Sequence, residues 1–207
     1  MKKIILFNTL TKKLELFKPI LPGKASMYAC GPTVYHYAHI GNLRTYIFED
    51  VLKRTLKKAG YDVRHIINIT DVGHLQSDAD EGQDKMLVAA KREGKDPWQI
   101  AKFYEAAFLK DYDRLNLQRP DIICRATEHI PEMIETIKGI EERGYTYTVD
   151  NNVYFDINKF PTYADFAKLK INQQNKGRVA IDPRKKNQED FVLWFSNSKY
   201  PNQIMKW

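Results

Sequence analysis

The apolar and polar stretches at the start of the chain follow the pattern of short strands. Ile4–Phe7 and Leu14–Phe17 are two apolar runs on either side of a short polar stretch, which is the pattern of a β-hairpin. After a Pro-Gly break, Met27–Cys30 is a short apolar run typical of a buried strand, and it ends at Gly31. The sequence therefore predicts a hairpin followed by a buried strand.

From Ile40 the apolar spacing changes to a helical period. One predicted helical face carries Ile40, Leu43, Ile47, Val51 and Leu56. Two lysines suit the last turn of this helix, and Gly60 suits its end. Val63–Thr70 is rich in β-branched residues and predicts a second strand. Two strands joined by a helix form a βαβ crossover, so the first part of the chain is expected to build an α/β fold with a parallel sheet.

The middle of the chain contains two further helical patterns. The stretch 72–83 is polar and acidic and predicts a loop, whereas Lys85–Glu93 predicts a helix. The next helix is expected to begin with Asp96 as its N-cap and Pro97 at its first helical position. Its apolar positions are Ile100, Phe103, Tyr104, Ala107 and Phe108. Residues 116–126 then predict a connection.

The last third of the chain changes in character. An amphipathic helix is predicted from Ile130, Met133, Ile134, Ile137 and Ile140, and it ends at Gly144. Two aromatic and β-branched segments follow, Tyr145–Val149 and Val153–Phe155, and they predict strands that meet at Asn151-Asn152. The stretch 168–190 is polar and basic.

The composition is that of a globular protein, and the length suits one sizeable core or a domain with a smaller attached subdomain. The chain has 207 residues, of which 43% are hydrophobic and 29% charged. No apolar run approaches the roughly 20 residues of a membrane-spanning helix, and no secretory signal is visible, so no membrane partner is expected. The two cysteines, Cys30 and Cys124, form no disulfide framework, so a cytoplasmic location is expected.

The charge balance is basic. Lys and Arg number 33 against 26 Asp and Glu, which gives a net charge of +7. Such a surface suits a polyanionic partner such as nucleic acid, but it equally suits a protein that is merely kept soluble by its charge. Charge alone leaves both interpretations open, and nothing in the sequence bears on oligomeric state.

The segment Cys30–Thr45, CGPTVYHYAHIGNLRT, carries the most specific candidate chemistry. A strand ends, a glycine-containing turn follows, and a helix begins near His39. The open amides and the positive end of such a helix attract phosphate, and His39 can donate a hydrogen bond to a phosphate oxygen. Gly41 lets a flat ligand approach the backbone closely. The alternative is a simple strand–turn–helix with solvated histidines, and the chemistry alone does not decide between the two.

Other candidate sites are weaker. An acidic stretch that starts at Asp78 suggests a calcium loop, but an EF-hand needs Gly at its sixth and Glu at its twelfth position, where Gln83 and Ala89 stand. Cys124 is interpreted as structural. The basic run 184–186 could contact RNA or form a solvated face.

The segment Cys30–Thr45 resembles the cysteinyl-tRNA synthetase form of the HIGH signature of class I aminoacyl-tRNA synthetases. Four later segments resemble that family in the same order: NITDVGHL, EGQDKM, RPDIICRATEHI and DFVLWFSNSKYPNQIMKW. The resemblance covers essentially the whole chain. It implies the first half of a Rossmann-like catalytic domain over residues 1–120, with the start of an inserted α+β subdomain, similar to the connective peptide of this family, over 121–207.

The resemblance also implies roles for individual residues. The contacts to ATP, with its Mg²⁺, fall on Thr33, His39, Gly41 and Asn42, of which His39 and Asn42 are also catalytic. The contacts to the substrate cysteine fall on Cys30, Gly31 and Thr70. Cys30 matches one of four ligands of a zinc ion, although taken alone it could be a small buried hydrophobe. Asn42 stands where the signature has its last histidine, and it can donate a hydrogen bond but cannot become cationic.

The implied function is that of a cysteine–tRNA ligase, whose partners are L-cysteine, ATP and tRNA(Cys). Cysteine and ATP give cysteinyl-adenylate and pyrophosphate, and the cysteinyl group then passes to the 3′ end of the tRNA. The remaining zinc ligands and the second ATP-binding loop of the family have no counterpart before Trp207, so the chain is expected to be a fragment that is inactive alone. The alternatives are a mycothiol-type cysteine ligase that uses a small amine acceptor, and an inactive nucleotide- or RNA-binding module.

Overall fold

The computed structural model describes residues 2–72, 85–166, 183–196 and 207. Contacts within the chain divide it into two compact units, the first formed mainly by residues up to His129 and the second mainly by residues from Ile130 onward. Among the helices of the described ranges, none combines the length and apolarity that a bilayer crossing requires.

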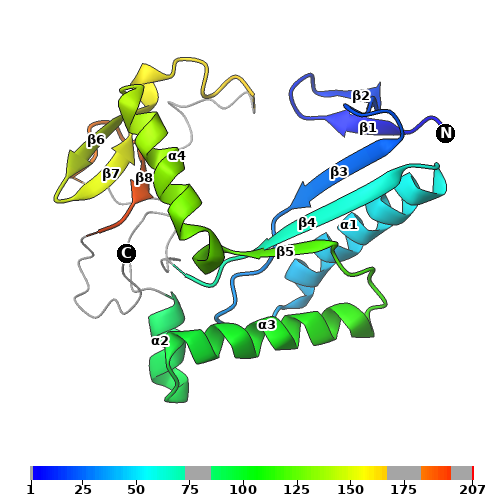
Figure 1. Cartoon of the computed structure of the whole chain (residues 1–207), viewed down its shortest axis with the longest axis horizontal. Coiled ribbons are helices and arrows are strands. Elements are labelled where there is room, and N and C mark those ends of the chain that lie inside the picture. The colour runs from blue at the N-terminus through cyan, green and yellow to red at the C-terminus, as the bar shows by residue number, and fades with distance from the viewer. Residues whose placement is uncertain (1, 73–84, 167–182, 197–206) are drawn as a thin grey trace. The chain divides into compact units, whose positions relative to one another are not determined.

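The first unit is built on a parallel three-stranded sheet. Its strands are β3 (Lys24–Ala29), β4 (Asp62–Ile69) and β5 (Ile122–Arg125), in the order β3-β4-β5. The helix α1 (Ile40–Lys58) connects β3 to β4, as Figure 1 shows. The predicted βαβ unit and the α/β class are therefore confirmed. The predicted hairpin is also present, as β1 (Ile5–Asn8) and β2 (Lys13–Leu16).

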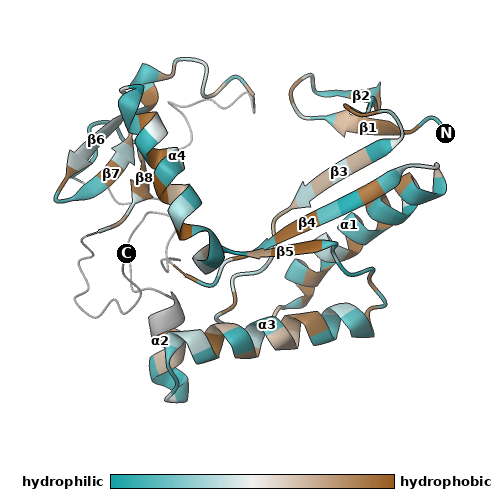
Figure 2. Ribbon diagram, in the orientation of Figure 1, coloured by the Kyte–Doolittle hydropathy of each residue, from teal (hydrophilic) through white to brown (hydrophobic). Residues whose placement is uncertain are grey.

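The core of this unit lies on one face of the sheet. Alternate residues of β4, from Val63 to Ile69, are buried, as a half-covered strand requires. In Figure 2 hydrophilic residues interrupt the hydrophobic ones along β4, whereas β5 is largely hydrophobic. The covering helices are α1 and α3 (Pro97–Arg114), and the main cluster includes Tyr46, Ile67, Ile69, Ile100, Tyr104, Phe108 and Tyr112.

The predicted inner face of α1 is only partly right: Leu56 is buried and Leu43 packs against the main cluster, whereas the other three positions are exposed. Ile40 is 87% exposed and Val51 55% exposed. The residues that the helix buries are Tyr46, Glu49, Asp50, Lys53 and Leu56.

Hydrogen bonds to the segment before β5 explain why α1 buries charged residues. Lys53 Nζ donates to the Arg119 carbonyl at 2.8 Å and to the Asp121 carboxylate at 3.2 Å. The Asp50 carboxylate accepts from the backbone N–H of Gln118 at 2.8 Å. Because these partners satisfy the buried charges of Lys53 and Asp50, α1 can turn a polar face toward the sheet.

The helices α2 (Lys85–Glu93) and α3 begin and end close to the predicted positions. Asp96 is the N-cap of α3, its side chain accepts from the Gln99 N–H, and Pro97 occupies the first turn. The predicted loop at 72–83 lies almost wholly outside the described residues.

The predicted connection 116–126 contains a strand, β5, that the sequence did not indicate. Its backbone pairs with β4, with Ile67 opposite Ile123. The compact units meet in the chain between His129 and Ile130, and the sequence pattern predicts a boundary between residues 120 and 121.

The second unit combines one helix with an antiparallel sheet. The helix α4 (Ile130–Glu142) precedes β6 (Thr146–Val149), β7 (Asn152–Phe155) and β8 (Phe191–Trp194), which pair in the order β6-β7-β8. Asp150 and Asn151 have φ values of 50° and 63° and form the turn between β6 and β7, one residue before the predicted position, because Asn152 already belongs to β7. Most of the predicted polar stretch 168–190 lies outside the described residues.

Candidate functional site

The candidate site lies where β3 and β4 end and α1 begins. The chain leaves β3 at Ala29 and runs alongside the end of β4 before it enters the helix. Thr33 and Thr70 form an isolated parallel bridge, in which the Val34 N–H donates to the Thr70 carbonyl at 3.1 Å and the Thr70 N–H donates to the Pro32 carbonyl at 3.0 Å. In an open α/β sheet this carboxyl edge is where ligands bind.

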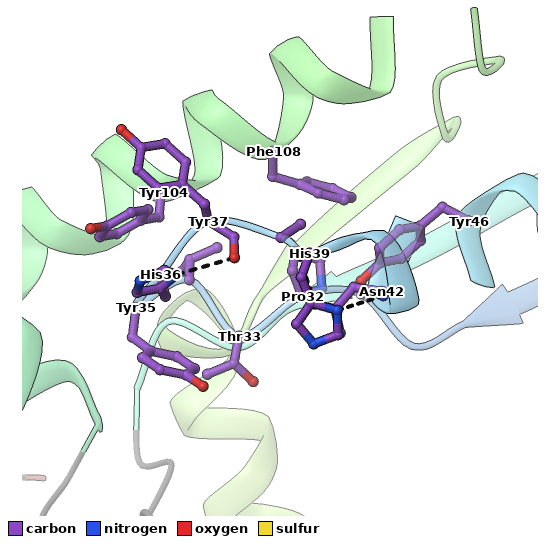
Figure 3. A pocket seen from close by; sticks show the side chains of 13 residues that line it. Pro32, Thr33, Tyr35, His36, Tyr37, His39, Asn42, Tyr46, Tyr104 and Phe108 are labelled. Carbon is purple, nitrogen blue, oxygen red and sulfur yellow. Dashed lines mark hydrogen bonds between the residues drawn. The ribbon is translucent and has the colours of Figure 1, made fainter. Parts of the chain in front are cut away.

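A cavity of about 320 Å³ opens at this edge. The segment between β3 and α1 forms one wall, and α3 supplies the opposite wall through Tyr104 and Phe108, as Figure 3 shows. The predicted residues that line it are Gly31, Thr33, His39 and Asn42, beside Pro32, Val34, Tyr35, His36, Tyr37, Ala38 and Tyr46.

His39 is the N-cap of α1. Its Nδ1 accepts hydrogen bonds from the backbone N–H groups of Gly41 at 3.1 Å and Asn42 at 3.3 Å. The Asn42 Oδ1 in turn accepts from the His39 N–H at 3.1 Å and completes a capping box. Because Nδ1 accepts two bonds it carries no proton, so the proton of the neutral ring lies on Nε2. His39 therefore presents a hydrogen-bond donor at an exposed helix N-terminus.

Gly41 leaves room for this ring. A Cβ at Gly41 would lie 2.9 Å from the Cε1 of His39, which is closer than real Cβ atoms approach other atoms. The first amides of α1 are thus covered by the histidine of the same turn. The sequence suggested that Gly41 admits a ligand, and the structure adds that it admits the His39 ring.

An ionic and aromatic network holds the α3 wall. His36 stacks on Tyr104 with ring centroids 6.0 Å apart, and the Tyr104 hydroxyl donates to the Glu93 carboxylate. Arg92 donates to Glu93 at 2.8 Å and to the Tyr104 oxygen at 3.1 Å. The hydrogen bonds from Tyr104 and Arg92 lower the pKa of Glu93 to about 2, so this carboxylate is ionised across the working pH range. The sequence does not single out Arg92 and Glu93, because nothing in the pattern of α2 distinguishes them from solvated charges.

The other predicted residues lie beside the cavity. Cys30 is an exposed free thiol whose Sγ lies 3.7 Å from the Gly31 carbonyl. Thr70 is half-buried and its Oγ1 accepts a hydrogen bond from Asn68 Nδ2 at 3.2 Å. Neither residue lines the cavity, and neither does Gly41. Gly31 therefore lines the cavity and also lies next to Cys30, which does not line it.

Gly31 makes a close backbone contact with β4. A Cβ at this position would lie 1.7 Å from the Asn68 carbonyl oxygen, so no side chain fits there without a backbone shift. The Gly31 N–H donates to Asn68 Oδ1 at 3.0 Å. A glycine is thus required on steric grounds between Cys30 and Pro32.

Asp71 joins the end of β4 to the end of β5. Its buried carboxylate accepts from the Thr127 N–H at 3.0 Å and from the Thr127 hydroxyl at 2.5 Å. Arg125, at the end of β5, forms a double hydrogen bond with Glu105 of α3 at 2.8 and 2.5 Å. These contacts tie the segment RATEHI to the same edge of the sheet.

A buried acid–base pair joins α1 and β4. His65 Nε2 and Glu49 Oε2 are 3.9 Å apart, and neither atom has a hydrogen-bond partner among the described residues. Burial raises the pKa of Glu49 to about 7, and burial together with the neighbouring Lys53 lowers the pKa of His65. Both groups are therefore shifted toward their neutral forms.

The described residues do not form a metal site on their own. In the ranges that the structure covers, no three His, Cys, Asp or Glu side chains gather as a metal ion would need. Zinc in proteins takes three or four protein ligands, and Cys30 supplies one suitable thiol. A zinc site would need ligands from outside these ranges.

The comparisons with known proteins agree with this geometry. Residues 16–207 match the family described as tRNA synthetases class I (C) catalytic domain. A LeuRS–tRNA–LeuAMS complex from Agrobacterium radiobacter K84 has a similar fold, with a TM-score of 0.50 and 21% identity over 69% of this chain and 17% of that chain. The chain therefore belongs to the class I tRNA synthetase family.

Its curated relatives are more specific. A protein of Treponema denticola named cysteine–tRNA ligase is 55% identical over 98% of this chain and 41% of that protein. One of Borrelia turicatae with the same name is 49% identical over 98% of this chain and 42% of its own length. The chain thus spans about two fifths of the length of the curated relatives it matches.

Proposed function

We propose that this chain is the part of a cysteine–tRNA ligase that holds ATP and begins the cysteine pocket. The observation that carries the proposal is the 55% identity to a cysteine–tRNA ligase over 98% of the chain. The site geometry supports it, because four of the seven predicted residues line one cavity at the carboxyl edge of a parallel sheet.

The first step of the proposed reaction forms cysteinyl-adenylate. A carboxylate oxygen of cysteine attacks the α-phosphorus of ATP, the new O–P bond forms, and the bond to pyrophosphate breaks. This step needs orientation and stabilisation of charge more than proton transfer. In the second step a ribose hydroxyl at the 3′ end of tRNA(Cys) attacks the activated carbonyl, and adenosine monophosphate leaves.

We assign the phosphate contacts to the start of α1. His39 Nε2–H is the donor that faces outward from the helix N-terminus, and the positive end of the helix dipole lies behind it. Thr33, Gly41 and Asn42 complete the ATP contacts. Asn42 acts in part through the capping box, because its Oδ1 holds the backbone of His39. Mg²⁺ accompanies the phosphates.

We assign cysteine to Cys30, Gly31 and Thr70. The exposed Cys30 thiol is available as one zinc ligand in the full-length protein, and zinc would favour a sulfur-bearing substrate. Two free cysteines also fit the cytoplasmic location that we propose.

Cysteine-dependent exchange between ATP and pyrophosphate in the full-length protein tests the first step. Exchange that requires cysteine and is not supported by serine is the expected result, and absence of exchange in zinc-loaded protein would refute the proposal. Charging of tRNA(Cys) tests the second step. Exchange without charging would instead indicate a small amine as acceptor.

A further inference from the structure

Asn68 makes three side-chain hydrogen bonds where β3 and β4 end, next to the residues assigned to cysteine. Its Oδ1 accepts from the Gly31 N–H at 3.0 Å and from the Tyr28 hydroxyl at 3.2 Å. Its Nδ2 donates to Thr70 Oγ1 at 3.2 Å. The side chain is half-buried on the face of β4 that α1 and α3 leave uncovered. One amide thus contacts two of the residues assigned to cysteine.

The orientation of this amide is fixed by its neighbours. The backbone N–H of Gly31 can only donate, so the atom of Asn68 that faces it must be the oxygen. The nitrogen therefore faces Thr70 and donates to it. Because the Thr70 oxygen accepts this bond, its hydroxyl hydrogen remains free to be donated to another group.

The backbone of Asn68 reinforces the arrangement. Its carbonyl oxygen occupies the space that a side chain at Gly31 would need, at 1.7 Å from the position of a Cβ. The residue therefore packs against Gly31 with its main chain while it binds the Gly31 N–H with its side chain. Two residues farther along, Thr70 continues the same strand into its bridge with Thr33.

We propose that Asn68 is a positioning residue for the cysteine pocket. It sets the Gly31 turn at a fixed distance from β4 and holds Thr70 as a hydrogen-bond donor toward an acceptor atom of the bound cysteine. This inference rests on the proposed function, because it assumes that Gly31 and Thr70 contact cysteine. Asn68 itself contacts neither cysteine nor ATP in this proposal, and it acts on cysteine through Thr70.

The substitution N68D separates the two halves of the amide. The carboxylate keeps an acceptor for the Gly31 N–H and the Tyr28 hydroxyl, but it has no N–H to donate. The Thr70 hydroxyl then turns to donate to the carboxylate and is lost to the substrate. We expect the KM for cysteine to rise about tenfold or more in the full-length enzyme, since a hydrogen bond to a charged group contributes about that factor. The KM for ATP should not change.

Two further variants make the test specific. Y28F removes a contact to the same Asn68 oxygen on the exposed side, and it should leave the KM for cysteine at the wild-type value. T70V removes the hydroxyl itself and should raise the KM for cysteine about as much as N68D does. In the T70V background N68D should add no more than about twofold, because its effect passes through the missing hydroxyl.

The outcomes distinguish this inference from the proposed function. A wild-type enzyme without cysteine-dependent exchange would contradict both. An active wild type whose KM for cysteine is unchanged in N68D, or in T70V should N68D not fold, contradicts the inference alone. The inference is also overturned if N68D raises the KM for cysteine equally in the wild-type and T70V backgrounds. That pattern indicates repulsion between the new charge and the cysteine carboxylate.

Discussion

Replacement of His39 by asparagine or alanine separates the two roles that the structure gives this side chain. The imidazole caps α1 through Nδ1 and presents a donor through Nε2. Asparagine is among the best N-cap residues, and its side-chain oxygen can accept from the same first-turn amides. It is too short to place a donor where Nε2 lies. H39N therefore keeps the cap and removes the donor, whereas H39A removes both.

The magnitudes of the two effects differ enough to be measured apart. Loss of an N-cap costs about 1 kcal/mol, so H39A should increase amide hydrogen exchange in the first turn of α1 about fivefold. H39N should leave that exchange rate near the wild-type value. Loss of one donor to a developing phosphate charge costs roughly 10²–10³ in rate, or about 3–4 kcal/mol. Both variants should therefore lose the same large factor in catalysis.

The assays are ATP–pyrophosphate exchange in the full-length protein and amide hydrogen exchange of the first turn of α1. Equal loss of catalysis in H39N and H39A, with weakened protection in H39A alone, is the expected pattern. If H39N retained exchange within about threefold of the wild type, His39 would act only as a helix cap. The assignment of its Nε2–H to the phosphate would then be refuted.

Three further predictions concern single positions. G31A should lower the affinity for cysteine at least tenfold and destabilise the first unit by roughly 1–3 kcal/mol, because its Cβ would overlap the Asn68 carbonyl; wild-type behaviour in both measurements would contradict the close contact. With a folded pKa of about 7 against an ordinary value of 4.5, Glu49 binds more protons in the folded state, so stability falls as pH rises between these values. E49Q should stabilise the chain by about 3 kcal/mol at pH 8 and by little at pH 5 in urea unfolding, and an equal effect at both pH values would refute the shift. C30S should lower the zinc content of the full-length protein, and unchanged zinc would remove Cys30 from the ligand set.

Local signals predicted the helices well. The bounds of α1 and the start of α3 follow from residues within one turn of each end, such as Asp96 and Pro97 at α3, and the two lysines in the last turn of α1 with Gly60 after it. Capping and termination depend on the chain's immediate neighbours, and these can be identified from sequence alone.

Long-range contacts account for the errors. Apolar spacing could not predict the charged part of the inner face of α1, because Asp50 and Lys53 are buried by partners more than 60 residues away, at Gln118 and Arg119. β5 was missed for a related reason, since a strand of four residues has too little alternation to stand out and is defined by its pairing with β4.

In the candidate site, too, local features could be predicted and long-range ones could not. His39 and Asn42 are three residues apart and form one capping box, so the motif that contains them identified a real structural unit. The wall that faces them was not predicted as part of the site. Tyr104 and Phe108 were expected on an apolar helix face, and they are indeed buried, but their position across the cavity depends on how α3 packs on the sheet.

The ends of the three parallel strands explain why this edge can serve as a binding site. Where a sheet stops, its backbone groups lose their ladder partners and must be satisfied by side chains, water or ligand. Here Asn68 satisfies the Gly31 amide and Asp71 satisfies the Thr127 amide, so the strand ends are fixed to one another by side chains of β4 and of the second residue after it. Two donors take no part in these contacts, the His39 Nε2–H and the Thr70 hydroxyl hydrogen. Each is held in place by a hydrogen bond that its own side chain accepts, at His39 Nδ1 from the Gly41 N–H and at Thr70 Oγ1 from Asn68. A donor whose orientation is set before the ligand arrives loses little freedom on binding, which is the condition for stabilising charge in a transition state.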